Sequence, residues 1–183
     1  MEFIKRRRYY YWCQAGMFEL FGTCGYMLAF NITKQTEYTA LVLFMMVLLS
    51  QKVSGGHLNP CISLGAFLNK KEYATDLCFL ATYMLSQLLG ALIALFPAYL
   101  LRVKVPRLSG EGYYLVPDQN PFYPAVVDET FGLSCYGQVF LAESIGAFLL
   151  VLSFLHLKKM VKSGDLSAAY FPFCYALIQA SLN

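Results

Sequence analysis

The sequence predicts an all-α membrane protein, and three observations lead to that fold class. Hydrophobic residues make up 58 % of the 183 residues and charged residues only 14 %, whereas roughly a quarter of the residues in a soluble domain are charged. The chain contains five long runs with few or no charges, and a short apolar segment follows a polar, glycine-containing stretch. A core of this size cannot bury so much apolar surface, so part of it must face lipid.

The five apolar runs set the expected membrane-spanning helices. They cover residues 12–33, 38–51, 77–101, 137–157 and 166–183. The hydrocarbon core of a bilayer is about 30 Å thick, and a helix needs about 20 apolar residues to cross it. The third and fourth runs reach that length directly. The first reaches it with Glu19 inside the membrane, and the second when it continues through Val53.

The basic residues predict the orientation of these helices. Nine fall on one side of the membrane if the runs alternate and the stretch around Asn59 returns to the side it left: Lys5, Arg6, Arg7, Arg8, Lys70, Lys71, Lys158, Lys159 and Lys162. Four fall on the other side: Lys34, Arg102, Lys104 and Arg107. Cytoplasmic loops carry the excess of Lys and Arg. We therefore expect the amino terminus on the cytoplasmic or equivalent side of a membrane that the sequence does not identify, an organellar one included.

The stretch SGGHLNPCISLG, residues 54–65, interrupts the apolar pattern. Asn is a good N-cap and Pro is favoured at the first helical position, so Asn59 and Pro60 predict the start of a helix that ends near Leu68. About ten residues of helix span roughly 15 Å, which is half of the hydrocarbon core. Two lysines follow the helix and belong at the interface. The start of the helix is therefore expected near the midplane of the membrane.

We interpret this segment as a re-entrant loop and half-helix. Non-helical backbone at that depth must be buried in protein or line a wet cavity. The first turn of the half-helix offers free N–H groups and a partial positive charge at the membrane centre. A polar cavity with such a centre passes neutral polar molecules and disfavours protons and cations. The alternative is a Gly-Pro loop that joins two helices outside the membrane.

Residues that bind metals or perform catalysis are sparse. Six cysteines are scattered without a CxxC spacing, and His57 and His156 are the two histidines of the sequence. This pattern favours membrane-embedded thiols over disulfides or a zinc site. The sequence carries no Ser/His/Asp set and no phosphate-binding loop, and GLSCYG at 132–137 does not match G-x-S-x-G. We expect no enzyme, no cofactor and no metal.

Two glutamates lie in similar apolar surroundings. FELFGT, residues 18–23, resembles AESIGA, residues 142–147. Carboxylates inside a membrane are costly and usually have a partner. Three spans separate the two copies, which gives them opposite orientations and indicates an inverted repeat; coincidence among common small residues is the alternative. We expect one membrane domain over 1–183, with a first repeat at about 13–101, a re-entrant loop at 54–69, a loop at 102–136 and an incomplete second repeat at about 137–183.

The residues quoted above resemble a known family. SGGHLNPCISLG closely resembles the first Asn-Pro-Ala loop of the aquaporin, or major intrinsic protein, family. FELFGTCGYMLAF is similar to the first helix of that family, YMLSQLLGALIAL to the third and GQVFLAESIGAFLLVLSFL to the fourth. The resemblance covers about residues 15–160. It implies an aquaporin-like helical bundle with five transmembrane helices and one re-entrant half-helix.

The resemblance also implies roles for residues of the loop. Asn59 would be the central pore donor, offering its amide N–H groups to a passing water while its oxygen caps the half-helix that starts at Pro60. Gly55, Gly56 and His57 would supply backbone carbonyls that line the pore. Selectivity in such pores follows from their width, their hydrogen-bonding groups and the positive ends of half-helices.

Four more positions take roles from the same resemblance. Glu19 would be a buried acceptor that holds the loop, and Glu143 would do the same for a second loop. Thr39 falls at a position of the second helix that is often aromatic in water channels, so a small residue there implies a wider constriction. Cys61 replaces the usual alanine and would place a thiol near the pore centre.

The sequence departs from the family pattern in its second half. A second Asn-Pro-Ala loop, its half-helix, the filter arginine and the sixth helix have no counterpart in the 183 residues. We expect a truncated or divergent member of the channel family for water and small neutral solutes. It would not conduct as this chain alone, and its missing half would come from residues beyond Asn183 or from a second chain. The alternative is a pore-dead structural subunit, an accessory of a larger membrane complex. The expected partners are the lipid bilayer and other membrane subunits, with a homo-oligomer left open and no nucleic acid.

Overall fold

The computed structural model describes residues 2–33, 35–69, 73–101, 104–105, 113–114 and 135–182. These ranges contain six helices: α1 (Glu2–Ile32), α2 (Thr36–Ser50), α3 (Pro60–Leu68), α4 (Tyr73–Leu101), α5 (Cys135–Ser163) and α6 (Phe171–Leu182). Two short strands, β1 (Lys104–Val105) and β2 (Tyr113–Tyr114), pair in antiparallel orientation. The predicted helical class is therefore confirmed, with one small hairpin added. The rest of the predicted loop at 102–136 lies outside the described residues, except that α5 already begins at Cys135.

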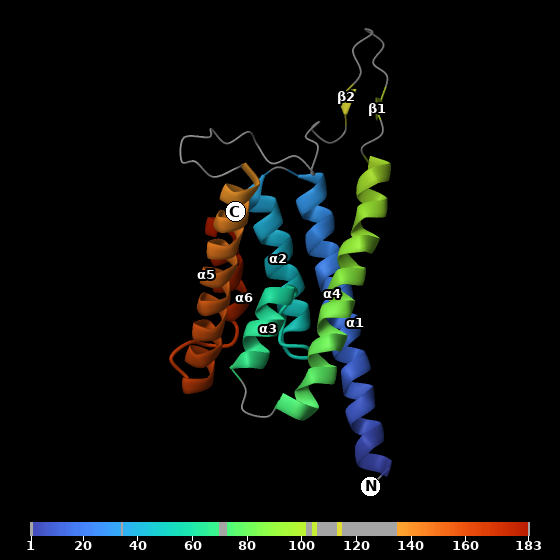
Figure 1. The fold of residues 1–183 in the computed structure, drawn as a ribbon, viewed down its shortest axis with the longest axis vertical. Coiled ribbons are helices and arrows are strands. Elements are labelled where there is room, and N and C mark those ends of the chain that lie inside the picture. Colours follow the sequence, from blue (N-terminus) through green and yellow to red (C-terminus); the bar gives the residue numbers. More distant parts are fainter. Residues whose placement is uncertain are drawn as a thin grey trace.

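The five longer helices form an incomplete ring, and the short helix α3 lies between the two helices at its open edge, α4 and α5 (Figure 1). α1 packs against α2 and α4, and α6 packs against α2 and α5. α3 packs against both α4 and α5, while these two long helices make no direct contact in the described part of the chain. α3 occupies only the lower half of the bundle in this view (Figure 1). The ring is thus closed by α3 at one end only.

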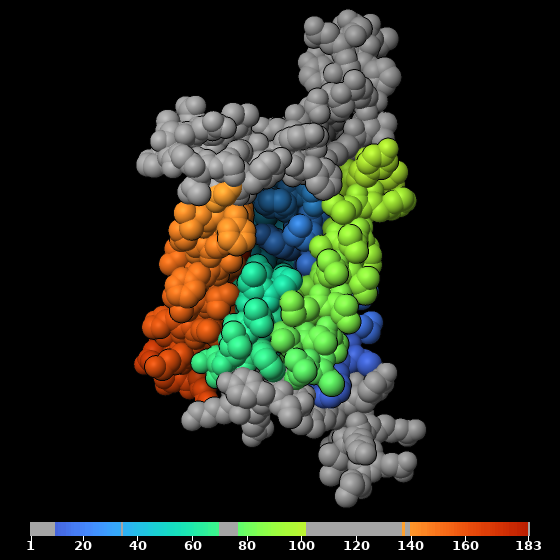
Figure 2. All heavy atoms as spheres, in the orientation of Figure 1, coloured from blue at the N-terminus to red at the C-terminus, as the bar shows by residue number. Residues whose placement is uncertain are grey.

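The open part of the ring is visible on the molecular surface. Figure 2 shows a hollow between α4 and α5 above α3, where the blue, early part of the chain comes into view. The helices that border the hollow carry large exposed apolar side chains, among them Leu92, Phe96 and Phe148. This face differs from the closed end, where α3 fills the space between its two neighbours (Figure 2).

Two helices are long and apolar enough to cross a membrane by length and composition. They are Leu77–Leu101 within α4 and Phe140–Ser163 within α5. Only 22 % and 17 % of their most apolar windows are buried inside the protein, so they are not core helices of a soluble fold. α2 and α6 are apolar but shorter, and α1 contains both the basic segment near its start and Glu19. The count of five spans stays a prediction.

Helix ends differ from the apolar runs where charged residues continue a helix. α5 extends past position 157 to Ser163, because lysine is a good helix former and the long side chains can reach the interface. It ends at Gly164, whose φ of +87° suits glycine. α1 likewise begins at Glu2 rather than at position 12. The apolar runs were bounded by charged residues in the sequence, but α1 and α5 continue through those residues.

The largest buried cluster lies between α2, the start of α3, α5 and α6. Its members are Leu43, Val47, Leu58, Ile62, Leu150, Phe154, Leu157, Phe171, Tyr175 and Ala176. The Phe154 ring packs edge-on against Phe171 and Tyr175, with centroid distances of 5.4 and 5.3 Å. These rings fill the space beside residues 54–58 on the side of α5 and α6.

Two glycines allow close contact between helices. A Cβ atom at Gly90 of α4 would lie 2.4 Å from the backbone oxygen of Leu20 in α1. A Cβ atom at Gly65 of α3 would lie 2.3 Å from Cγ1 of Val151 in α5. Both distances are shorter than any real carbon contact, so the two helix pairs depend on the absence of a side chain. Gly146 of α5, in contrast, has nothing within 4 Å of the same position.

Candidate functional site

The candidate site is the irregular loop that connects α2 to α3, residues 51–59. After a turn at the end of α2, the backbone takes positive φ values at Gly55 (+92°), Gly56 (+67°) and Leu58 (+51°). Glycine adopts such values without strain, and a leucine rarely does. Leu58 is held there by burial, because its side chain is 3 % exposed and lies against Gly22 of α1. The N–H and C=O groups of this irregular stretch are therefore not paired within a helix. They need hydrogen-bond partners from the surrounding helices.

Glu19 of α1 binds the loop from one side. Its side chain is fully buried, and Oε1 accepts hydrogen bonds from Ser54 Oγ at 2.5 Å and from the backbone N–H of His57 at 3.0 Å. Oε2 accepts from the backbone N–H of Leu58 at 2.7 Å and from Gln87 Nε2 at 2.7 Å. A buried carboxylate is tolerated only when hydrogen bonds replace its hydration. Four donors from the loop and α4 meet that condition here.

Side chains of α4 extend this network to α3. Gln87 Nε2 also donates to Ser63 Oγ at 2.9 Å, and Ser63 Oγ lies 3.2 Å from Nδ1 of His57. The Tyr83 hydroxyl donates to the backbone oxygen of Ser54. Two further buried atoms, Gln87 Oε1 and Thr23 Oγ1, have no hydrogen-bond partner among the described residues. The network ties three helices to the loop through side chains that are almost completely buried.

Asn59 begins α3 at the end of the loop. Its backbone is extended, with φ −151° and ψ 129°, and its Oδ1 accepts a hydrogen bond of 2.8 Å from the backbone N–H of Cys61. Pro60 occupies the first helical position. Both features are typical of a helix start. The Cys61 side chain is exposed, so the first turn of α3 is not fully buried in the bundle.

Lys158 of α5 and Tyr175 of α6 bind the loop from the opposite side. Lys158 Nζ donates to the backbone oxygen of Gly55 at 2.8 Å. The Tyr175 hydroxyl donates to the backbone oxygen of His57 at 3.3 Å. The ammonium also lies over two rings, 4.4 Å from the centroid of Phe171 and 5.4 Å from that of Phe154. Two carbonyl oxygens of the loop, those of Gly55 and His57, are thus hydrogen-bonded within the chain.

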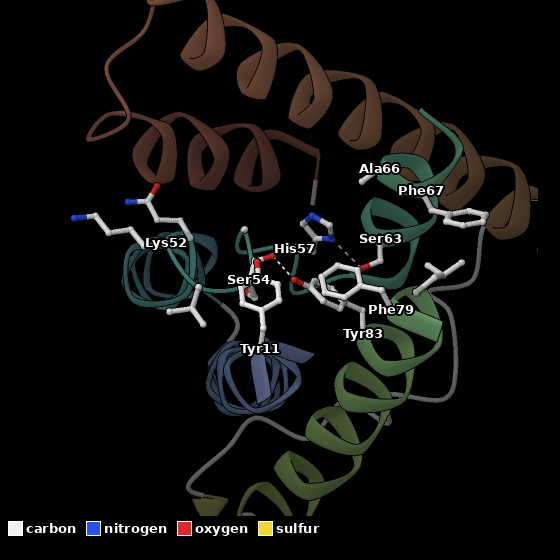
Figure 3. Close-up of a pocket in the computed structure, with 13 residues that line it drawn as sticks. Tyr11, Lys52, Ser54, His57, Ser63, Ala66, Phe67, Phe79 and Tyr83 are labelled. Atoms are coloured by element: carbon white, nitrogen blue, oxygen red, sulfur yellow. Dashed lines mark hydrogen bonds between the residues drawn. The ribbon is translucent and has the colours of Figure 1, made fainter. Parts of the chain in front are cut away.

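A cavity of about 280 Å³ lies beside the loop, between α1, α3 and α4 (Figure 3). Its lining combines aromatic rings with polar groups of the loop and α3: Tyr11, Phe67, Phe79, Tyr83, Ser54, His57 and Ser63. The dashed contacts in Figure 3 join His57 to Ser63 and Ser54 to Tyr83. The polar groups on its wall therefore pair with one another. The cavity therefore provides space next to the loop, but these polar groups of its lining already have hydrogen-bond partners.

The remaining predicted site residues lie away from the loop. Thr39 is buried in the first turns of α2, where its hydroxyl donates to the backbone oxygen of Gln35 at 3.4 Å. Glu143 lies on α5 with an exposed side chain. The loop-binding residues Tyr83, Lys158 and Tyr175 were not singled out by the sequence. The lysine lies in a group of basic residues that looks like an interface cluster, and the two tyrosines lie in apolar runs. Nothing in the sequence distinguishes them from ordinary helix residues.

A comparison with known families now adds to this geometry. The family model of the major intrinsic proteins matches residues 11–182, which is nearly the whole chain. The chain belongs to the major intrinsic protein family. Family membership makes this major intrinsic protein an integral membrane protein of a family that contains water and solute channels.

A curated relative agrees with the family assignment. The chain is 31 % identical over 96 residues to a probable aquaporin TIP-type alpha of Phaseolus vulgaris. The matched region is 51 % of this major intrinsic protein and 35 % of the relative, so the chain matches about a third of the length of that protein. No solved structure matches the chain at a significant level.

The arrangement gives this major intrinsic protein a fixed polar loop inside an apolar bundle. The Glu19 carboxylate accepts from two N–H groups of the loop, and an ammonium and two phenols donate to three of its carbonyl oxygens. Such a loop can position hydrogen-bonding groups for a small polar solute. In the described residues, no group of three or more His, Cys, Asp or Glu side chains could hold a metal ion.

Proposed function

We propose that residues 54–59 and α3 form the re-entrant half of an aquaporin-type pore for water or small neutral solutes. The observation that carries this proposal is the four-bond contact of Glu19, which holds the loop inside the bundle next to the start of α3. α3 has nine residues and is about 14 Å long, half the thickness of the hydrocarbon core. The proposal includes five spanning helices, an amino terminus on the cytoplasmic side and an incomplete inverted repeat.

Asn59 supports the pore role by the way its side chain is used. Its Oδ1 accepts the hydrogen bond from the Cys61 N–H. This bond restricts rotation of the side-chain amide and so fixes the direction of Nδ2. Nδ2 donates no hydrogen bond to any described residue. The amide N–H groups are therefore available to a passing acceptor such as a water oxygen.

We further propose that the chain does not conduct by itself in the arrangement described. Lys158 and Tyr175 use the backbone oxygens of Gly55 and His57, and the rings beside them are 1 to 2 % exposed. Each of these bonds occupies one of the two lone pairs of a carbonyl oxygen, and the donor side chain stands beside that oxygen, where a solute would have to approach. A water path along the loop would require these side chains to move.

Osmotic shrinkage of liposomes that contain the purified chain tests this proposal. We expect water permeability equal to that of empty liposomes made from the same lipid. A permeability well above that of empty liposomes, abolished in Asn59→Leu, would contradict the closed arrangement and support an open pore. The Glu143→Gln variant is the control, because its side chain is exposed and distant from the loop network.

A second function, an accessory subunit of a larger membrane complex, is favoured by the hollow between α4 and α5. The backbones of these helices do not come close to each other in the described residues. Figure 2 shows the hollow between them, and both helices carry exposed apolar side chains. A membrane helix of another subunit would cover that surface. Cysteine crosslinking in native membranes tests this: a cysteine at Phe96, which is 69 % exposed, should react with a partner chain, and labelling by lipid-phase probes alone would exclude the role.

A further inference from the structure

The ammonium group of Lys158 lies in a small cage on the carbonyl side of the loop. The cage consists of the Gly55 oxygen, at 2.8 Å, and the rings of Phe171 and Phe154, whose centroids are 4.4 and 5.4 Å away. A carbonyl oxygen accepts from the N–H groups of a cation, and aromatic faces attract its charge. These are the groups that recognise an alkylammonium ion.

The cage is built by the fold rather than by the lysine. Phe154 and Phe171 are 1 and 2 % exposed; Phe154 packs edge-on against Phe171 and Tyr175, and Phe171 stacks on Tyr175. The direction of the Gly55 carbonyl is set by the positive φ of that glycine and by the bonds of the next residues to Glu19. Neither element depends on the side chain of Lys158, so the cage is expected to persist when that side chain is shortened.

Among the described residues Lys158 forms no ion pair, and the buried Glu19 carboxylate acts on its charge from a longer distance. Within the described ranges, no carboxylate oxygen lies within 4.0 Å of Nζ. Its neighbour Lys159 is exposed and has no such surroundings. The half-buried Lys158 side chain is therefore held by dipole and ring contacts, which any ammonium of similar size could make.

We propose that this cage is an alkylammonium-binding site and that Lys158 is its tethered ligand, which joins the carbonyl side of the loop to α5 and α6. The binding site itself is independent of conduction; the further statement that the tethered ammonium closes a solute path rests on the proposed function. Lys158 lies near the end of α5 (Figure 1), so a free ion can approach from the aqueous side when the lysine side chain is absent.

Chemical rescue of Lys158→Ala tests the site. The substitution removes the three carbons and the ammonium beyond Cβ, and n-propylammonium is the missing fragment. We expect Lys158→Ala to lower the Tm of the full chain in detergent by several degrees, and n-propylammonium chloride to restore a saturable part of the loss. Sodium chloride at equal ionic strength and 1-propanol, which has the same length without charge, should restore nothing. The wild type and Lys159→Ala should show no saturable response.

Equal responses of Lys158→Ala, Lys159→Ala and the wild type would overturn the proposal, as would a folded Lys158→Ala protein that does not respond. If Lys158→Ala does not fold, a cycle of Lys158→Met, Phe171→Leu and the double variant decides. The loss of Tm in the double variant should be smaller than the sum of the two single losses, because both substitutions remove the same cation–ring contact. Strictly additive losses would overturn the cage.

Permeability measurements on liposomes distinguish the alkylammonium site from the statement that the Lys158 ammonium closes a solute path. If a solute path follows the loop, Lys158→Ala should raise osmotic water permeability above that of Lys159→Ala, and n-propylammonium should lower it again. Thermal rescue without any change in permeability supports the ammonium site and rejects the closed path. A rise in permeability that n-propylammonium does not reverse, together with an absence of thermal rescue, rejects the site and leaves the proposed pore half intact.

Discussion

The two sides of the central loop are held in different ways. On the side of α1 and α4, one buried carboxylate collects four hydrogen bonds, and two of its donors are backbone N–H groups. On the side of α5 and α6, two separate side chains each donate one hydrogen bond to a backbone oxygen. The Glu19 side is completely buried, whereas Lys158 is half-buried near the end of its helix.

This difference indicates which side is fixed and which can be released. Breaking the Glu19 contact leaves several buried donors without a partner, and each such donor costs about 1 to 3 kcal/mol. Breaking one contact on the other side frees a single carbonyl oxygen, and the lysine can move its charge toward water. The loop is thus fixed to the first half of the chain and more weakly held by the second half.

The largest expected effect is that of Glu19→Gln. The substitution removes the charge and places an amide NH₂ opposite buried donors, so we expect a loss of about 3 kcal/mol in the free energy of unfolding. For a chain of this size that corresponds to a Tm lower by roughly 6–12 °C in a thermal scan in detergent. Glu143→Gln, on an exposed site of α5, is the control and should change stability by no more than about 0.5 kcal/mol. Equal losses for the two variants would contradict the distinction between them.

Gly90→Ala should have the second largest effect. It would push α1 and α4 apart on the side of the loop that Glu19 holds. The new Cβ would lie 2.4 Å from a backbone oxygen, which cannot move aside as a side chain does. We expect a loss of about 2 kcal/mol from overpacking, measured by thermal unfolding. Gly146→Ala enters open space within a helix and should be neutral or stabilising by up to about 1 kcal/mol. A neutral Gly90→Ala would show that the two helices are not in close contact.

Asn59→Ala tests the end of the loop that neither side holds directly. It removes the hydrogen bond from the Cys61 N–H to the cap oxygen, and N-cap losses cost about 1 kcal/mol. Thermal unfolding should show this loss, and Asn59→Asp, which keeps the cap oxygen, should retain most of the stability. If Asn59→Asp is as unstable as Asn59→Ala, then the cap is not the source of the effect.

The smallest expected effect is that of Tyr175→Phe on the releasable side. It deletes one hydroxyl whose hydrogen bond to His57 is 3.3 Å long and keeps the ring in its cluster. The stability should fall by about 0.5 to 1 kcal/mol, so a chemical denaturation curve is the better measurement. A loss as large as that of Glu19→Gln would show that the two sides of the loop are held equally.

Much of the fold could be read from the sequence because its signals are local. The Asn-Pro pair and the following nine-residue apolar segment predict a short helix, and α3 spans Pro60–Leu68. A carboxylate inside an apolar run is costly enough to single out Glu19 without any structure. The same argument singled out Glu143, whose side chain is exposed in the structure. Sequence context alone does not show which buried-looking carboxylate accepts hydrogen bonds in the folded protein and which one is exposed.

The partners of the loop on the α5 and α6 side could not be predicted. Lys158 entered the sequence argument only as one of nine basic residues that set the orientation. Tyr175 lies in an apolar run, where its hydroxyl is not distinguishable from a ring that merely packs. Both contacts join residues more than 100 positions apart, and no periodicity or motif connects them. Long-range contacts of this kind depend on how the helices meet.

The spacing of these contacts along the chain has a consequence for biogenesis. The Glu19 carboxylate reaches its loop partners 35 to 39 positions later and Gln87 after 68. Lys158 and Tyr175 are synthesised 103 and 118 positions after their partners Gly55 and His57. A nascent chain can therefore complete the Glu19 contacts of the loop once α4 has been synthesised, while the backbone oxygens of Gly55 and His57 do not yet have these two donors. We therefore expect the loop to take its final position late, after α5 and α6 have been synthesised.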